Sequence, residues 1–135
     1  MGDRTGDRLM GAARRLRRLL FEAMAEIGVT PAQGRALRLV TELEPVRLTA
    51  LADHLHIAPR STTEVVDALE TAGLVVRVPD PHDRRATCVE VTPAGRVRAA
   101  ELDEIRDAVT EDFLTPLSPS QRQALDGLLT MLVED

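Results

Sequence analysis

One helix with a defined start and end constrains the fold of this chain more than any other segment. Pro59 has the fixed φ angle of a first helical residue, and Gly73 stands where a helix can end in the left-handed conformation. Leu74 can then pack back on the last turn. The segment predicts a helix of about fourteen residues, roughly 21 Å long, which would fit the major groove of DNA.

The residues before this helix predict a shorter helix and a turn. Apolar side chains recur there at the i, i+3, i+4 and i+7 spacing of one helical face. They are Leu48, Leu51, Ala52 and Leu55. The turn is assigned to His54, His56, Ile57 and Ala58. Residues 48–73 are therefore expected to form two helices joined by a turn.

After Gly73 the pattern becomes that of two short β-strands. Residues 74–78 are rich in β-branched side chains, and residues 86–92 alternate in polarity. In the second strand we expect Val89 and Val91 to point inward and Cys88 and Glu90 outward. The two strands would form a hairpin, or wing. Its loop, 79–85, is polar, stiffened by proline and rich in arginine, as in a solvent-exposed arm.

The central helix is predicted to have one buried face. Winding the sequence at about 100° per residue gathers its apolar side chains on one side. The buried set is Thr62, Val65, Val66, Leu69 and Ala72. The outward set is Arg60, Thr63, Glu64, Asp67 and Thr71, with Ser61 on the flank near the amino end.

Longer amphipathic helices are predicted on both sides of this unit. One covers 8–27, and others begin at Pro31, Pro93 and Pro119, each after a threonine or serine that can cap a helix. The first has a basic side, which either faces solvent or contacts phosphate. The first and the last two have apolar faces too long for a winged core of about sixty residues to cover, so they need each other or a second subunit.

The amino-acid composition limits which partners and which cellular compartment we expect for this protein. At 135 residues we expect a single domain. The net charge of −5 argues against a nucleic-acid partner, but nine acids and only two arginines lie in residues 101–135. The single cysteine, Cys88, excludes an internal disulfide. Because no apolar run approaches about eighteen residues and no signal pattern precedes Arg18, we expect a cytoplasmic protein.

In their order and spacing, these motifs resemble the MarR family of winged-helix transcription regulators. The motifs lie at 30–33, 51–55, 59–75, 83–85, 91–96 and 117–121. The resemblance implies a mostly α fold with a small β-wing, and one MarR-type domain over 1–135. Residues 30–92 would form the winged helix-turn-helix DNA-binding lobe, and 8–28 and 93–134 the helices that interlock in a homodimer.

The resemblance also implies which helix residues meet DNA. Four of them match the amino end of the family's recognition helix, which enters the major groove. They are Pro59, Arg60, Ser61 and Thr63. Ala58 departs from the family, which often has a serine cap there, so a side-chain acceptor worth roughly 1 kcal/mol is lost. Glu64 stands where the family often has a basic or polar residue; it either accepts from cytosine or pairs with Arg60.

In the wing, Asp83 and Arg85 match a family motif in which the aspartate orients an arginine that reaches the minor groove. Arg84 is included with Arg85 among the expected DNA contacts.

Many members of the family bind small, often aromatic anions in a cleft between the dimer helices and the lobe. The corresponding walls in this chain are Leu16, Leu20, Met24, Arg38 and the fifth helix. A plain apolar core is the alternative interpretation of these residues. Members that sense peroxide use a cysteine in the first helix, which this chain lacks, and we expect Cys88 to be inert.

No metal site, cofactor or enzymatic activity is expected. His54, His56 and His82 are poorly placed to converge on one ion, and no set of nucleophile, base and orienting group is present. We expect a dimeric double-stranded DNA-binding regulator that represses at pseudo-palindromic operators and can be released by a small effector. The alternative is a winged-helix protein-interaction module with weak or no specific DNA binding, suggested by Glu64, Asp67 and the acidic tail.

Overall fold

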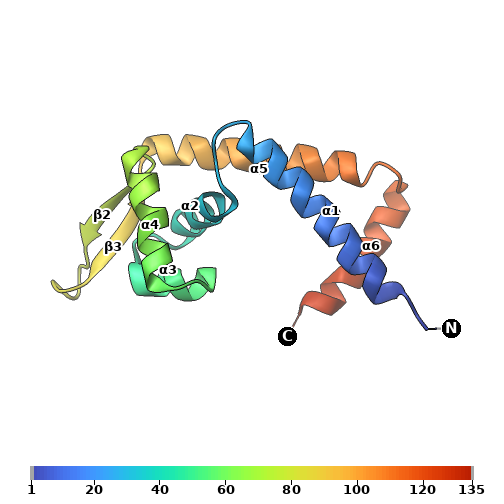
Figure 1. Cartoon of the computed structure of the whole chain (residues 1–135), viewed down its shortest axis with the longest axis horizontal. Helices are drawn as coiled ribbons and strands as arrows, with labels where there is room; N and C mark the ends of the chain where they lie inside the picture. The colour runs from blue at the N-terminus through green and yellow to red at the C-terminus, as the bar shows by residue number, and fades with distance from the viewer. Residues whose placement is uncertain (1, 135) are drawn as a thin grey trace.

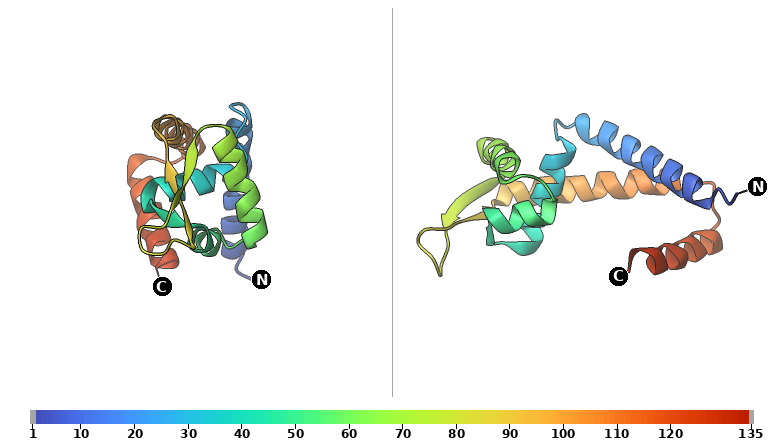
Figure 2. Two further views of the ribbon diagram at one scale, coloured as in Figure 1. Left: turned by 90° about the vertical axis from the view of Figure 1, so that its left-hand side faces the viewer. Right: turned by 60° about the horizontal axis from the view of Figure 1, so that its bottom comes forward.

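The computed structural model describes residues 2–134 and folds them into six helices and three short strands (Figure 1). In chain order the elements are α1 (Thr5–Ala25), α2 (Pro31–Leu43), β1 (Val46–Arg47), α3 (Leu48–Leu55), α4 (Pro59–Thr71), β2 (Val75–Pro79), β3 (Thr87–Val91), α5 (Pro93–Phe113) and α6 (Pro119–Val133). The strands and α2, α3 and α4 form a lobe, and α1, α6 and the carboxyl half of α5 extend to one side of it (Figures 1 and 2). The predicted mostly helical fold with a small wing is confirmed.

Helix starts follow the predicted capping residues. Thr30 Oγ1 accepts from the N–H of Gln33 at 3.2 Å, and Gln33 Oε1 accepts from the N–H of Thr30 at 3.2 Å. Ser118 and Gln121 form the same reciprocal pair at the start of α6. Because these bonds satisfy amides that a helix start leaves unpaired, α2 and α6 begin at the prolines that the sequence indicated.

The end of α4 has the geometry that Gly73 predicted. Gly73 adopts φ 77°, its N–H donates to the carbonyl of Glu70 at 2.9 Å, and the N–H of Leu74 donates to Leu69 at 2.9 Å. The helix ends at Thr71, so Ala72 is an exposed cap residue rather than part of the buried face. The expectation for Ala72 was wrong because the chain leaves the helix one residue earlier.

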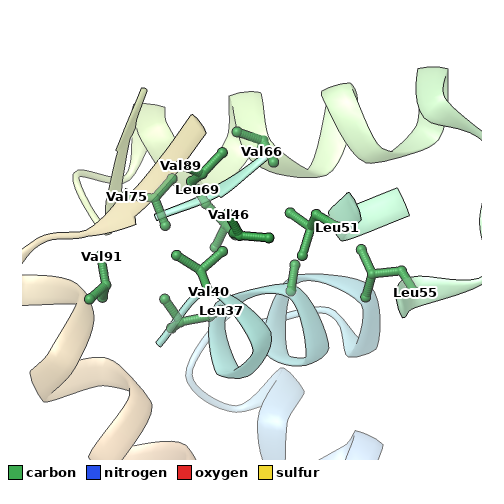
Figure 3. Packing of buried hydrophobic residues seen from close by; sticks show 11 residues of the cluster. Leu37, Val40, Val46, Leu51, Leu55, Val66, Leu69, Val75, Val89 and Val91 are labelled. Atoms are coloured by element: carbon green, nitrogen blue, oxygen red, sulfur yellow. The ribbon is translucent and has the colours of Figure 1, made fainter. Parts of the chain in front are cut away.

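The lobe has one apolar core, where α2, α3 and α4 meet the small sheet (Figure 3). Its fully buried side chains include Leu37, Val40, Leu51, Val66 and Val89. Thr62 is buried with them, and its hydroxyl donates to the carbonyl of Ala58 at 3.1 Å, so the polar group is satisfied. This packing fixes α4 by one face and leaves the other on the surface.

The wing has three strands, one more than predicted. The order is β1-β3-β2, all antiparallel, with Val46 opposite Val89 and Arg77 opposite Val89 on the other side. β1 is only two residues long, too short to produce an alternating pattern. It places Arg47 opposite Cys88 of β3.

Cys88 is buried, with 2% of its surface exposed, whereas the sequence predicted an outward side chain. The strand does alternate, but the face opposite the core is not solvated at this point. Asp80, from the end of the hairpin, lies over it, with 3.6 Å between Cys88 Sγ and Asp80 Oδ2. A tertiary contact therefore covers a position that alternation alone would expose.

The helices outside the lobe leave apolar surface uncovered. No residue of α1 or α6 is buried, although α1 packs along α5 and Arg15 lies over the Phe113 ring at 5.7 Å. Exposed apolar side chains include Leu9, Met10, Phe21, Val97, Leu128, Met131, Leu132 and Val133. Among residues 2–134, no helix is long and apolar enough to cross a membrane.

Candidate nucleic-acid interface

The amino end of α4 presents unpaired backbone donors at the surface. Because Ala58 has no side-chain acceptor, the N–H groups of Arg60 and Ser61 have no hydrogen-bond partner within residues 2–134. Thr63 Oγ1 donates to the carbonyl of Pro59 at 3.1 Å, and its oxygen can still accept. Free amides at the positive end of a helix dipole favour an anion such as a phosphate.

The turn before α4 is set by His56 in the left-handed conformation, with φ 55°. His54, which the sequence placed in the turn, instead lies within α3. Arg35 of α2 donates from Nη2 to the carbonyl of Leu55 at 3.3 Å, which ties the end of α3 to α2. The turn therefore consists of residues 56–58, and α4 leaves it with its amino end exposed.

Glu64 is exposed on the outward face of α4, one turn from Arg60. Within the part of the chain that the structure describes, the two side chains make no ion pair, so the i+4 pairing considered for Glu64 is not formed. The carboxylate is left available to a partner.

The other acids of this face are held from the wing. Arg77 of β2 donates from Nη2 to Asp67 Oδ1 at 2.6 Å and from Nη1 to Glu70 Oε1 at 2.7 Å. Burial alone would lower the pKa of Arg77, but the hydrogen bond to Asp67 and the charge of Glu70 raise it. The guanidinium stays charged between the two carboxylates.

A single carboxylate organises the base of the wing loop. Asp80 Oδ1 accepts from the N–H of His82 at 2.7 Å and from that of Asp83 at 3.2 Å, while Oδ2 accepts from Arg47 Nε at 2.5 Å. These bonds lower the pKa of Asp80 to about 2; the bond from His82 has the largest effect and the bond from Arg47 the next largest. The expectation that the whole loop is a solvated arm is therefore wrong at Asp80, which is only 8% exposed.

Asp83, the residue expected to orient Arg85, acts on the backbone. Its Oδ1 accepts from the N–H of Arg85 at 3.0 Å, and its carbonyl accepts from Ala86 at 3.0 Å. The side chains of Arg84 and Arg85 are exposed and pair with no acid among residues 2–134. The loop thus carries two cations on a constrained backbone.

The wing loop and the amino end of α4 lie on the same side of the lobe, away from α5 (Figure 1). The structure thus brings the helix residues 59–64 and the wing residues 83–85, which are separated in sequence, to one surface of the lobe. Within residues 2–134 no group of three or more histidine, cysteine or acidic side chains is placed to hold a metal ion.

A cleft of about 780 Å³ lies between α1, α2 and α5. The four predicted pocket residues, Leu16, Leu20, Met24 and Arg38, all line it. Arg17 and Arg106 also line it, and neither makes an ion pair with another residue of 2–134. Arg38 is held by Glu42 at 3.4 Å. The lining is mostly apolar, and its charged side chains are four arginines and two acids, which suits a small anion with an apolar part. The charged residues are Arg17, Arg35, Arg38, Arg106, Glu42 and Asp103.

Comparison with known proteins agrees with this architecture. The profile of the MarR family matches residues 29–87. A probable transcriptional regulator from Pseudomonas aeruginosa, known as a crystal structure, is 30% identical with a TM-score of 0.77, and the match covers 97% of this chain and 98% of that one. The chain belongs to the MarR family.

Apo MarR from E. coli shares the fold, with a TM-score of 0.87 at 21% identity over 99% of this chain and all of that one. Bordetella bronchiseptica BpsR, whose DNA binding is regulated by 6-hydroxynicotinic acid, gives 0.76 at 25% identity over 97% of this chain and 94% of that one.

Two curated relatives are transcriptional regulators. One is the putative regulatory protein for the hcr operon of Thauera aromatica, 34% identical over 105 residues, or 78% of this chain. The other is the Bacillus subtilis repressor MdtR, 26% identical over 102 residues, or 76%. The matches span 63% and 66% of those proteins' lengths. Membership in a family of transcription regulators agrees with the expectation that this chain is not an enzyme.

Three residues of this MarR family member were missed by sequence reasoning. Asp80 carries a weak signal, since it lies between two prolines in a loop. Arg47 and Arg77 carry none, because each acts on a partner from another element. Their roles depend on tertiary placement rather than on spacing along the chain.

Proposed function

We propose that this protein is a dimeric, sequence-specific double-stranded DNA-binding transcription regulator that represses at pseudo-palindromic operators. The observation that carries the proposal is the shared surface of α4's amino end and the wing loop (Figure 1). The free amides of Arg60 and Ser61 would hold phosphate, with Ser61, Thr63 and Glu64 reading base edges in the major groove. Arg84 and Arg85 would enter or border the minor groove.

A dimer would supply a second DNA-binding lobe. In a symmetric pair, the α4 helices would lie in successive major grooves about 34 Å apart. The uncovered apolar side chains of α1, α5 and α6 support pairing through these helices, because exposed apolar surface of this extent normally marks an interface.

We further propose that a small carboxylate or similar anion releases the DNA by binding in the cleft between α1, α2 and α5. Leu16, Leu20 and Met24 would contact its apolar part, and Arg38, with Arg17 and Arg106, its charge. The regulation of BpsR by 6-hydroxynicotinic acid supports this class of effector. A thermal-shift screen with small carboxylates tests it; a hit should also weaken DNA binding, and it should lose its effect in the Arg17→Gln variant.

The decisive experiment is selection of bound fragments from the source genome, followed by salt titration of the enriched site. We expect a palindromic sequence whose affinity falls steeply with salt, because phosphate contacts release counterions. Arg85→Ala should weaken binding to all sequences, whereas Ser61→Ala or Thr63→Ala should change sequence preference. Failure to enrich any fragment would instead favour a protein-interaction module, for which the exposed Glu64 and the acidic α5 are the supporting features.

A further inference from the structure

The outward face of α4 is acidic for a helix that would approach DNA. Besides Arg60, it exposes Glu64, Asp67 and Glu70. Carboxylates held close to phosphates repel them, and such like-charge contacts cost affinity. A positively charged side chain on another element offsets part of this negative charge.

This side chain is that of Arg77 in β2. Its guanidinium bonds Asp67 at 2.6 Å and Glu70 at 2.7 Å, two carboxylates that lie three residues apart on one side of α4. The Arg77 side chain is 24% exposed, against 60% and 42% for the two acids, so the cation is held between the helix and the strand. The planar guanidinium has five N–H donors in a fixed fork, so separate nitrogens can bond the two carboxylates at once.

The backbone takes part in the same contact. β2 is an edge strand, because the sheet order is β1-β3-β2. The N–H of Arg77 donates to Glu70 Oε2 at 3.2 Å, so Glu70 bonds both the side chain and the main chain of the wing strand. α4 and the wing are thereby joined outside the apolar core.

We propose that Arg77 is a positioning and charge-neutralising residue for DNA binding, which holds Asp67 and Glu70 against the wing and fixes the wing relative to α4. The inference rests on the proposed DNA-binding function. Arg77 acts through these two carboxylates, so its loss is corrected by removing their charges. The pairing with Arg77 also explains why this face of α4 can carry Asp67 and Glu70.

The test compares four proteins on the selected operator and on an unrelated fragment of equal length. They are the wild type, Arg77→Gln, the triple variant Arg77→Gln/Asp67→Asn/Glu70→Gln, and the control Arg98→Gln. The control removes an arginine that is 34% exposed and pairs with Glu101 at 2.9 Å, so it matches the change in net charge while breaking one ion pair instead of two. Affinity, salt dependence and thermal midpoint are measured for each.

We expect Arg77→Gln to weaken binding to both fragments by roughly tenfold, because the repulsion between carboxylates and phosphates does not depend on the base sequence. The triple variant should return to within about threefold of wild type, because its group at positions 67, 70 and 77 is neutral, against one net negative charge in the wild type and two in Arg77→Gln. Arg98→Gln should stay near wild type, because it leaves these three side chains unchanged. Recovery of affinity without recovery of the thermal midpoint separates neutralisation from a merely structural role.

Two results would overturn the inference about Arg77 and leave the proposed DNA-binding function standing. In one, the wild type binds DNA and Arg77→Gln binds equally well. In the other, the triple variant stays as weak as Arg77→Gln, which would show that Arg77 contacts DNA directly or supports only the fold. If the wild type binds no selected fragment, the proposed function falls, and the inference falls with it.

Discussion

Arg47 Nε donates to Asp80 Oδ2 at 2.5 Å, joining two residues 33 positions apart in the sequence. Arg47 belongs to β1 and Asp80 to the wing loop, so this bond ties the loop to the strand that precedes α3. The same carboxylate accepts two backbone N–H groups of the loop. The position of the wing therefore depends on Asp80 more directly than on Asp83.

Replacing Asp80 should loosen the wing. Asp80→Asn removes the charge that holds Arg47, so trypsin should cut after Arg84 and Arg85 several times faster than in the wild type, because these exposed arginines become easier to bind. The matched control is Asp83→Asn, which keeps the Arg47 contact and should change the rate less. Mass spectrometry of timed digests measures both. Equal rates for the two variants would contradict this assignment.

Asp80 should also make stability depend on pH in acid. Its pKa is lowered in the folded protein from 3.8 to about 2, so the ionised form favours folding. The contribution is complete well above pH 3.8 and is lost as the pH falls towards 2. We expect the wild type to have the higher thermal midpoint near pH 6 and the difference from Asp80→Asn to shrink between pH 4 and 2. A difference that stays constant over that range would refute the linkage.

Gly95 should tolerate no side chain. A Cβ there would overlap the carbonyl of Leu74 and approach Val91 Cγ2 at 2.7 Å, where the start of α5 lies against the residue before β2 and the end of β3. Gly95→Ala should lower the free energy of unfolding by about 1–3 kcal/mol, measured by urea denaturation. Gly127→Ala, in open space on α6, is the control and should be neutral or stabilising. Two indistinguishable variants would disprove the close approach.

Cys88 should react slowly with thiol reagents in the native protein. Burial raises the pKa of its thiol, and the nearby Asp80 carboxylate raises it further, so little thiolate is present at neutral pH. Labelling followed by absorbance should be at least tenfold slower than for the protein unfolded in guanidinium, because the side chain is covered. Native labelling at the unfolded rate would mean that the loop does not cover this strand.

The apolar surface of α6 should be needed for dimer formation. Met131 is 74% and Val133 77% exposed in the single chain. Met131→Asp should raise the dimer dissociation constant at least tenfold, as seen by sedimentation, because a charge would be placed in an apolar interface. Val76→Asp, an exposed substitution on the wing, should leave the dimer intact. A monomeric wild type would exclude the dimer altogether.

The lobe was largely predictable from local signals. Prolines 31, 59, 93 and 119 and the capping side chains of Thr30, Thr92 and Ser118 set helix starts, and Gly73 ends α4, because φ restriction and unpaired amides act within one turn. The spacing of apolar residues gave the buried face at Thr62, Val66 and Leu69. The motif order predicted the MarR family correctly.

The candidate interface was predictable only in part. Residues 59–64 and 83–85 were named from motifs, and their surroundings came from the fold. Asp83 bonds the backbone of Arg85, and Glu64 makes no pair with Arg60 in the described residues. The pairs Arg47–Asp80 and Arg77–Glu70 join separate elements, so no periodicity could reveal them.

The sequence by itself therefore determined the starts of the four helices that open on a proline, most of the buried face of α4 and the family that the chain resembles, because caps, prolines and apolar spacing act over a few residues. It placed other helix ends less well, since α1 runs from Thr5 to Ala25 and not over 8–27. Only the tertiary structure decided that Cys88 is covered, that Asp80 organises the wing and that the acids of α4 are held by Arg77. Those outcomes depend on the close approach of distant segments, and hydrogen bonds and ion pairs of about 3 Å form only once the core has brought the segments together.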